Sequence, residues 1–321
     1  MAVWGGIDLG GTFIKAAVVD DGGHVHGESR LPTPRAASPT AVLDQMTAAL
    51  AEAERLAAAR VLAVGIGVPG LVDPDGRIRS LPNLPGWAGE NPAAALTARL
   101  GRPVRVENDA NAAAMAERWI GAGRQFPDFL LLTLGTGIGG GLVLGGELQR
   151  GSHGRAGEPG HIKIEPDGLP CGCGGTGCLE QYAAAPALIR AARVAIAAGR
   201  LAPPAMGEAL TPEWLNRAAR SGSPAALEIH AEAAAALGQA LAAVISIVDV
   251  TVFILAGGVA GAFDLLAPPL RSAIERRAFG LDPATLVLEP AACGSEAGMI
   301  GAALLAARGF PAGGSPAPGS G

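Results

Sequence analysis

Short apolar runs that end in glycines alternate with longer stretches of helical periodicity along the chain. Residues 3–9 and 14–19 are apolar on either side of a glycine turn, which predicts two adjacent strands, and residues 24–30 are a candidate third strand. A long helix is expected next, with Ser38 or Thr40 as its N-cap, because large apolar residues then recur at helical spacing. The elements predicted after it are strands at 61–67 and 104–106 and helices at 91–100 and 110–119.

The second half of the chain repeats the theme of the first. A strand at 129–134, a glycine turn at 135–141 and a returning strand at 142–144 reproduce the opening strand–turn–strand pattern. The remaining predicted elements are helices at 184–198, 225–248 and 297–307 and a strand at 252–255. The repeat predicts two related α/β domains that face each other.

Length and composition narrow the class of protein. The chain has 321 residues, which corresponds to about two domains. Its 49% hydrophobic and 17% charged residues exclude disorder of the whole chain, although residues 309–321 have the composition of a disordered tail. The formal net charge of -5 argues against nucleic acid or an anionic membrane as the main partner, because both would require a basic surface.

Targeting signals and cysteine usage predict a cytoplasmic protein. No run of about 18 uninterrupted apolar residues occurs, so no spanning helix is expected, and the N-terminus lacks the basic start of a signal peptide. Four cysteines cannot form a disulfide scaffold in a chain of this length. Three of them lie within one short segment, which indicates a metal site.

The first glycine turn carries residues suited to phosphate and magnesium. Gly10 and Gly11 let backbone N–H groups approach an anion without a Cβ in the way. Asp8 ends the preceding strand and is suited to Mg²⁺, Thr12 is suited to a phosphate oxygen, and Lys15 follows three residues on. An ordinary Asp-Gly hairpin would use the same turn residues, so this segment by itself leaves both interpretations open.

Two more glycine turns favour a nucleotide site. Gly135, Thr136 and Gly137 follow an apolar strand as the first turn does, and two such turns fit the phosphates of a nucleotide held between two domains. Gly257 and Gly258 end a third buried strand and are candidates for the border of an adenosine site. A plain strand-to-helix turn is the alternative for this last pair.

A polar trio, residues 107–109, supplies a candidate base at the end of the strand predicted at 104–106. Phosphoryl transfer to a hydroxyl requires an in-line acceptor and a carboxylate that takes the acceptor's proton. Asp109 is placed for that role, and Asn108 is suited to orienting a neighbouring hydroxyl. Both residue types also suit a helix N-cap, and the two roles are compatible.

Residues 157–180 contain the most specific local pattern. Three thiolates and one imidazole form the closed tetrahedral set expected of a structural zinc site. The predicted ligands are His161, Cys171, Cys173 and Cys178. Cys293 lies far away in the sequence and is expected to be a core or free thiol.

Two glutamates bracket the predicted zinc ligands. Folding the loop around the metal would bring Glu158 and Glu180 to one place, where two carboxylates suit the hydroxyls of a sugar. His161 is suited to binding zinc through one ring nitrogen and donating to a sugar oxygen from the other. Solvated surface is the alternative for both glutamates.

Together these motifs resemble the ROK family of sugar kinases and related repressors, from Asp8 to about Ala307, with a complete ExGH and CxCGxxGCxE pattern. The resemblance implies the two-domain actin-like (ribonuclease H-like) ATPase fold, an α/β architecture with a cleft between mixed sheets. It implies Asp109 as the catalytic base and a sugar site made of Asn83, Asn108, Asp109, Glu158, His161 and Glu180. The residues expected at the nucleotide are Asp8, Gly10, Gly11, Thr12, Lys15, Gly135, Thr136, Gly137, Gly257 and Gly258.

Within the family the chain is most similar to bacterial glucokinases, which implies transfer of the γ-phosphoryl group of ATP to the 6-hydroxyl of glucose. The implied cofactors are ATP, Mg²⁺ and structural Zn²⁺. N-acetylmannosamine and N-acetylglucosamine kinases share nearly all of these motifs, and polyphosphate is an open alternative donor. A non-catalytic, sugar-responsive regulator is less favoured, because a repressor needs a basic DNA-reading domain and the first strand begins at about residue 3.

The same resemblance sets the expected organisation of the chain. Residues 1–117 with 297–308 are predicted to form the N-terminal domain, and residues 118–296 the C-terminal domain with the zinc loop. The expected partners are a small-molecule sugar and a nucleotide, with no nucleic acid and no membrane. A homo-dimer or homo-tetramer is expected by family analogy alone.

Overall fold

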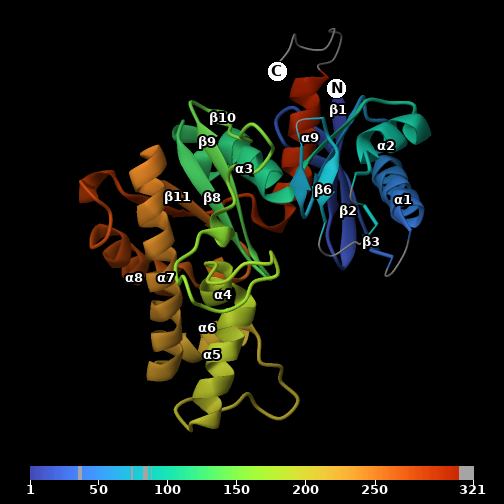
Figure 1. Ribbon diagram of the computed structural model, residues 1–321. Helices are drawn as coiled ribbons and strands as arrows, with labels where there is room; N and C mark the ends of the chain where they lie inside the picture. Colours follow the sequence, from blue (N-terminus) through green and yellow to red (C-terminus); the bar gives the residue numbers. More distant parts are fainter. Residues whose placement is uncertain (35–37, 74, 82–85, 88, 311–321) are drawn as a thin grey trace. The chain divides into compact units, whose positions relative to one another are not determined.

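The computed structural model describes residues 1–34, 38–73, 75–81, 86–87 and 89–310 (Figure 1). Contacts within the chain divide it into two compact units. Unit 1 comprises Met1–Pro127, Gly141–Ala156 and the chain from Ala292 onward, and unit 2 comprises Asp128–Gly140 and Gly157–Ala291. The tail predicted at 309–321 lies outside the described residues from position 311.

A five-stranded sheet forms the centre of unit 1. Its strands are β1 (Val3–Leu9), β2 (Phe13–Asp20), β3 (Val25–Pro32), β4 (Val64–Val68) and β7 (Val104–Asn108), in the order β3-β2-β1-β4-β7. The first three are antiparallel neighbours, whereas β1, β4 and β7 run parallel. Ile7, Leu9, Ile14 and Ile66 are fully buried against this sheet. The five strands predicted for this region are thus confirmed, with ends shifted by a few residues.

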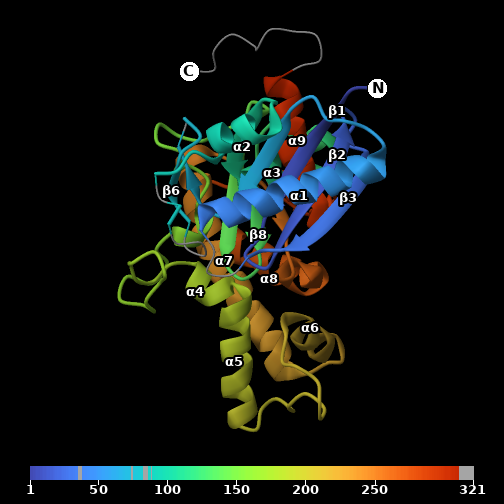
Figure 2. The ribbon, with the colours of Figure 1, turned by 90° about the vertical axis from the view of Figure 1, so that its right-hand side faces the viewer.

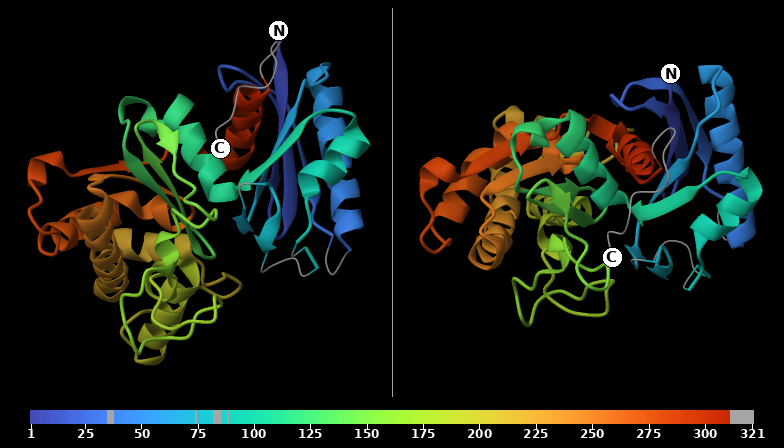
Figure 3. Two further views of the ribbon diagram at one scale, coloured as in Figure 1. Left: turned by 45° about the horizontal axis from the view of Figure 1, so that its top comes forward. Right: turned by 90° about the horizontal axis from the view of Figure 1, so that it is seen from above.

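Helices cover both faces of the sheet in unit 1. The helices are α1 (Pro39–Ala57), α2 (Pro92–Leu100), α3 (Asp109–Ile120) and α9 (Ala297–Gly309). α1 contacts β2 and β3, whereas α9 contacts β1, β4 and α3, and Figure 3 shows α1 and α9 on opposite sides of the sheet. A hairpin of β5 (Leu71–Val72) and β6 (Ile78–Ser80) lies between β4 and α2, and the sequence predicted neither of these short strands.

The second sheet repeats the strand order of the first. Its strands are β8 (Phe129–Leu134), β9 (Ile138–Leu144), β10 (Glu147–Leu148), β11 (Val252–Ala256) and β12 (Val287–Pro290), in the order β10-β9-β8-β11-β12. β11 is parallel to β8 and β12, and β10 is antiparallel to β9. If the strands of each sheet are numbered from one to five in chain order, both sheets have the spatial order 3-2-1-4-5. This correspondence confirms the internal repeat that the two strand–turn–strand motifs predicted.

In the described part of unit 2, four helices pack around a fifth, which is the longest of them. The five helices are α4 (Glu180–Ala183), α5 (Ala185–Ala197), α6 (Pro212–Arg220), α7 (Pro224–Val248) and α8 (Phe263–Glu275), and α7 contacts the other four (Figure 2). The sequence predicted α5 and α7 but not α4, α6 or α8. α8 contains Pro268 and Pro269 within its length. Because proline usually ends a helix, the sequence of this segment did not predict one.

Short 3₁₀ helices complete the described secondary structure. They span Ala122–Gln125, Pro159–His161, Val259–Ala262, Pro283–Thr285 and Gly294–Glu296. The first and last of them lie in unit 1 close to the points where the chain passes to or from unit 2.

α7 is also the one helix, among the residues described, whose length and composition would suffice to cross a membrane. Its most apolar window has a mean hydropathy of 1.7, and 44% of that window is buried inside the protein. A helix in the core of a globular unit meets the same test, and the contacts of α7 with four neighbouring helices are of that kind.

The contact-based units differ from the predicted domain ranges in three segments. Residues 118–127, 141–156 and 292–296 belong to unit 1 by their contacts, whereas the sequence assigned them to the C-terminal domain. The domain ranges themselves stay a prediction.

α9 approaches its neighbours so closely that three glycines are required. A Cβ on Gly6 would lie 1.8 Å from Met299 O, and a Cβ on Gly65 would lie 1.9 Å from Ala302 O. On α9 itself, a Cβ on Gly301 would lie 1.8 Å from Ala112 O of α3. The backbone of α9 therefore touches the backbone of two strands and one helix directly.

We expect Gly301→Ala to lower the free energy of unfolding by about 2–3 kcal/mol through overpacking. Alanine is the better helix former, so intrinsic propensity alone would predict the opposite sign. Urea unfolding of the two proteins measures the difference. Gly261→Ala is the control, because no atom lies within 4 Å of its Cβ position, and an equal response of both variants would contradict the close contact.

Candidate functional site

The β1–β2 turn holds its two exposed residues, Gly11 and Thr12, on a fixed frame. The N–H of Gly10 donates to Phe13 O at 3.0 Å, and a Cβ on Gly10 would lie 2.8 Å from that oxygen. The hydroxyl of Thr33 donates to Gly10 O at 2.6 Å. The backbone at the tip of the turn is thus shaped by the strands on both sides.

Asp8 and Lys15 lie opposite each other on β1 and β2, next to the start of α9. Burial raises the pKa of the Asp8 carboxyl, and the charge of Lys15 opposes the shift. Lys15 Nζ donates to Ser295 O at 2.9 Å. A Cβ on Gly298 would lie 3.3 Å from Asp8 Cγ. The segment that leads into α9 therefore borders both side chains.

Asn108 and Asp109 join β7 to α3. The Asn108 carboxamide oxygen accepts from the N–H of Asn111 at 2.9 Å, and its amide nitrogen donates to Gly70 O at 3.1 Å. The N-cap role is therefore real, and the side chain is fixed by it. Asp109 Oδ1 accepts from the N–H of Ala110 at 2.8 Å.

The carboxyl ends of three parallel strands bring Asp8 and Asp109 to one edge of the unit 1 sheet. Asp8 is the register partner of Gly67 on β4, and Gly67 is the partner of Glu107 on β7. A Cβ on Gly67 would lie 3.4 Å from Asp109 Cα. Ligands of α/β sheets bind at this end of the strands.

Glu107 is a buried carboxylate directly behind the candidate base, and the sequence analysis assigned it no role. It accepts from Asn111 Nδ2 at 3.0 Å, from the N–H of Asn108 at 3.1 Å and from Arg150 Nε at 2.7 Å. The Arg150 pair neutralises a carboxylate that is only 6% exposed. Its place in the polar trio was the one sequence signal that could have pointed to Glu107. The pairing with Arg150 has no local signature, because the two residues lie 43 positions apart.

The two glycine turns of unit 2 lie together. A Cβ on Gly257, which has φ +92°, would lie 2.4 Å from Leu134 O at the end of β8. In the turn after β8, the N–H of Gly135 donates to Gly137 O at 2.9 Å. Thr136, Gly257 and Gly258 are exposed. The carboxyl ends of β8 and β11 thus share one edge of the sheet.

Four potential metal ligands converge in the loop before α4. The ligand atoms of His161, Cys171, Cys173 and Cys178 all lie within 4.8 Å of one another. Two of the separations are 3.5 Å (Cys173 Sγ to Cys178 Sγ) and 3.9 Å (Cys171 Sγ to His161 Nδ1). A tetrahedral site with Zn–S bonds of about 2.3 Å has edges of about 3.8 Å, so the donor set and its size fit zinc.

Glycines give a tight shape to the segment from Glu158 to Glu180 that carries the four potential ligands, which we call the metal loop. Gly174 and Gly177 have φ of +87° and +68°, and a Cβ on Gly177 would lie 1.6 Å from Glu165 O. Lys163 Nζ donates to Cys178 Sγ at 2.7 Å, which places a positive charge beside the sulfur cluster. The loop is therefore folded around the four ligand atoms by its own backbone.

Glu158 and Glu180 lie near each other beside this cluster. Burial, together with the negative charge of Glu180, raises the pKa of the Glu158 carboxyl to about 7. Glu180 accepts from the N–H of Ile138 at 3.1 Å, and a Cβ on Gly137 would lie 2.4 Å from its Oε2. Glu180 thus connects the metal loop to the glycine turn after β8.

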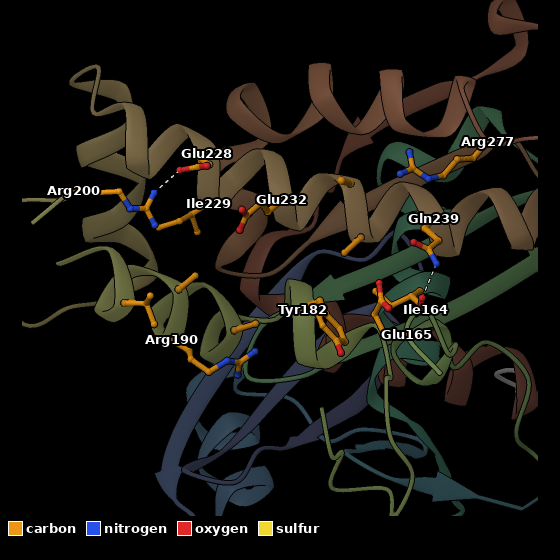
Figure 4. Close-up of a pocket in the computed structure, with 15 residues that line it drawn as sticks. Ile164, Glu165, Tyr182, Arg190, Arg200, Glu228, Ile229, Glu232, Gln239 and Arg277 are labelled. Atoms are coloured by element: carbon orange, nitrogen blue, oxygen red, sulfur yellow. Dashed lines mark hydrogen bonds and ion pairs between the residues drawn. The ribbon is translucent and has the colours of Figure 1, made fainter. Parts of the chain in front are cut away.

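A groove of about 540 Å³ elsewhere in unit 2 contains none of the predicted site residues. It lies between α5 and α7, where Arg200 pairs with Glu228 and Gln239 donates to Ile164 O (Figure 4). Asn83, which the family resemblance placed at the sugar, lies outside the described residues.

Comparison with known proteins identifies this architecture. The ROK family model matches residues 4–308. A glucokinase of Streptomyces coelicolor is 39% identical over 318 residues, which cover 94% of this chain and 96% of that protein. An N-acetyl-D-glucosamine kinase of Escherichia coli is 40% identical over 187 residues, 55% of this chain and 61% of that protein.

A solved structure gives the same picture. The ROK family glucokinase of Streptomyces griseus, in complex with glucose and AMPPNP, matches with a TM-score of 0.83 and 38% identity, covering 96% of this chain and 100% of that chain. The fold is therefore the two-domain actin-like ATPase fold of sugar kinases, as the sequence motifs predicted. The chain belongs to the ROK family.

We expect Glu158→Gln to stabilise the protein at high pH. A carboxyl with a pKa of about 7 in the folded state and 4.5 when unfolded binds more protons when folded, so stability is lost as the pH rises through this window. The free energy of unfolding of the variant should exceed that of the wild type by about 3 kcal/mol at pH values above this window. Below the window the two free energies should be equal. Urea unfolding across this range measures the difference.

Glu165→Gln, which changes an exposed glutamate of the same loop, is the matched control and should alter stability little at either pH. A stability difference for Glu158→Gln that does not vary with pH would contradict the raised pKa.

Proposed function

We propose that the protein is an ATP-dependent hexose kinase that phosphorylates the 6-hydroxyl of glucose. The observation that carries the proposal is the similarity to glucokinases over 94% of the chain or more. The family match over residues 4–308 spans both glycine turns, the Asn108–Asp109 pair and the metal loop. ATP as donor is supported by the nucleotide analogue in the Streptomyces griseus complex.

In unit 1, Asp109 is proposed to accept the proton of the attacking hydroxyl. Phosphoryl transfer needs positioning and charge stabilisation more than covalent chemistry, so a fixed carboxylate suffices. The start of α3 fixes the backbone of Asp109, and Asn108 is held by Gly70 and Asn111. The buried Asp8 carboxylate is suited to Mg²⁺, which when bound would neutralise charge on the phosphates. Lys15 and the backbone at Gly10, Gly11 and Thr12 would bind phosphate oxygens.

In unit 2, Glu158, His161 and Glu180 are proposed to bind the other sugar hydroxyls. A carboxylate accepts hydrogen bonds from hydroxyls, and Glu158 has no other hydrogen bond or ion pair at its carboxylate among the residues described. The turn of Gly135, Thr136 and Gly137 and the pair Gly257 and Gly258 are proposed to border the nucleotide. His161 has a second ring nitrogen, suited to a sugar oxygen, when the first ligates zinc.

Zinc is proposed as a structural ion at His161, Cys171, Cys173 and Cys178. Four protein ligands fill a tetrahedral site, so the ion would hold the loop in shape and leave no position for a reacting water. The loop carries Glu158 and ends at Glu180, so its shape sets the positions of both glutamates.

We expect the purified protein to form ADP from Mg-ATP fastest with glucose, compared with mannose, fructose, N-acetylglucosamine and N-acetylmannosamine. Asp109→Asn should lower kcat by a factor of about 10²–10⁴, because it removes the proton acceptor. Glucose affinity measured by calorimetry should change little, since the amide keeps the size of the carboxylate.

The control is Asp44→Asn, an exposed aspartate on α1 that pairs with Arg99. An Asp109→Asn enzyme that keeps kcat within tenfold of the control contradicts the assignment of the base. A preference for an acetamido sugar would move the substrate to the second candidate, which the partial match to an N-acetyl-D-glucosamine kinase favours. Activity with polyphosphate alone would replace ATP as the donor.

We expect one zinc ion per chain by elemental analysis of the purified protein. Cys178→Ser should lose most of it, melt at a lower temperature and bind glucose more weakly, because the loop that carries Glu158 loses its centre. Cys293→Ser is the matched control, since Cys293 lies outside the cluster, and it should retain full zinc. Wild-type protein that is active and free of zinc would overturn the metal assignment.

A further inference from the structure

Glu117, near the end of α3, is a fully buried carboxylate that the proposed mechanism does not use. The described residues form no ion pair with it. An unpaired carboxylate away from water is costly, so its compensation must come from hydrogen bonds.

Three backbone N–H groups and the thiol of Cys293 supply that compensation. Glu117 Oε2 accepts from Ala122 at 2.7 Å and from Ala292 at 3.1 Å, and Oε1 accepts from Cys293 at 2.7 Å. A Cβ on Gly121 would lie 2.0 Å from Oε2, so the glycine makes room for the carboxylate. Both oxygens of one side chain thus hold two segments that are about 170 residues apart in sequence.

Both segments lie in unit 1, next to a crossing, that is, a place where the chain passes from one unit to the other. Ala122 begins the 3₁₀ helix that leads to the passage from Pro127 to Asp128, and Ala292 is the first residue after the chain returns from unit 2. The chain crosses between the units at four places, so Glu117 anchors the unit 1 side of two of them.

The same contact also fixes candidate site residues within unit 1. α3 begins at Asp109, the proposed base, and carries Glu117 two turns later. Beyond Cys293 lies Ser295, whose carbonyl accepts from Lys15, and then Gly298, which borders Asp8. Glu117 therefore connects the helix of the proposed base to the segment that borders the proposed phosphate side.

We propose that Glu117 is a positioning residue for phosphoryl transfer. It fixes the unit 1 ends of both crossings to α3, so that Asp109 and the Asp8–Lys15 pair keep their spacing within unit 1. This inference rests on the proposed kinase function for its effect on rate. It assigns to Glu117 an effect on kcat and none on the affinity for glucose, because the proposed sugar ligands Glu158, His161 and Glu180 belong to unit 2. In unit 1, Asn108 is held by its own hydrogen bonds to Gly70 and Asn111.

The test is Glu117→Gln in the full-length protein. Glutamine keeps the shape, but its amide nitrogen cannot accept, so at least one N–H loses its partner. kcat should fall by about tenfold or more, because small displacements of reacting groups are costly, while the calorimetric Kd for glucose stays within about twofold. Activity is measured well below the melting temperature of each protein, so that loss of folded protein does not contribute.

Glu54→Gln is the matched control. Glu54 accepts from the N–H of Val61 at 2.8 Å and pairs with Arg102, in the same unit, and it contacts no candidate site residue. A purely structural role for Glu117 predicts that both variants lose stability and neither loses kcat. Equal kcat values for the two variants, or a parallel loss of glucose affinity in Glu117→Gln, would overturn the proposal.

Amide hydrogen exchange gives a second readout that needs neither activity nor a folded variant. In the wild type, the amides of Ala122, Ala292 and Cys293 should exchange slowly, and equally slowly with glucose and AMPPNP present, because the anchor does not open. Fast exchange, or exchange that changes with ligand, would contradict the anchor whatever the protein phosphorylates. If instead the wild type formed ADP with no sugar while these amides stayed protected, the kinase function would fail and the anchor would stand.

Discussion

The direct backbone contact between α9 and the sheet of unit 1 is the constraint on which the rest of that unit depends. α9 comes from the end of the described chain, yet it touches β1, the first strand, through Gly6 and β4 through Gly65. It also touches α3 through Gly301. Because no side chain separates these elements, the strands that carry Asp8 and the helix that begins at Asp109 are held at one fixed spacing. α9 therefore packs on the sheet without a gap, and its first turn lies beside the end of the first strand.

The repeated strand order explains why glycine turns recur at corresponding places. In each sheet the first two strands are joined by a turn of glycines and a threonine, and a parallel fourth strand ends beside it. Backbone N–H groups at such turns are suited to anions, so one architecture supplies two phosphate-binding candidates. Unit 2 adds the metal loop, whose Glu180 reaches the turn at Gly137. Each unit thus has its own set of polar groups at the carboxyl ends of its parallel strands.

Local patterns were predictable from sequence, and contacts between distant segments were not. The strand at 129–134 and the helix at 110–119 follow from short-range periodicity, and the metal cluster follows from ligand spacing in a single loop. α8 was hidden by two internal prolines, and β12 is only four residues long, too short for a clear periodicity. Glu107 pairs with Arg150, 43 residues away, and Glu117 accepts from Ala292, 175 residues away, so only the fold shows that these carboxylates are buried and held. Tertiary contacts of this kind have no local signature.

Three buried or half-buried glutamates differ in whether the protein itself compensates their charge. Glu107 is neutralised by Arg150, and Glu117 is held by three backbone N–H groups, so both charges are compensated within unit 1. Glu158 has neither kind of partner among the described residues. Its burial, together with the like charge of Glu180, raises the pKa of its carboxyl to about 7. A site that keeps a carboxylate uncompensated gains stability when a ligand donates to it. Sugar hydroxyls are such donors, so burial of Glu158 without a protein partner among the described residues is the electrostatic feature of unit 2 that supports its proposed role as a sugar ligand.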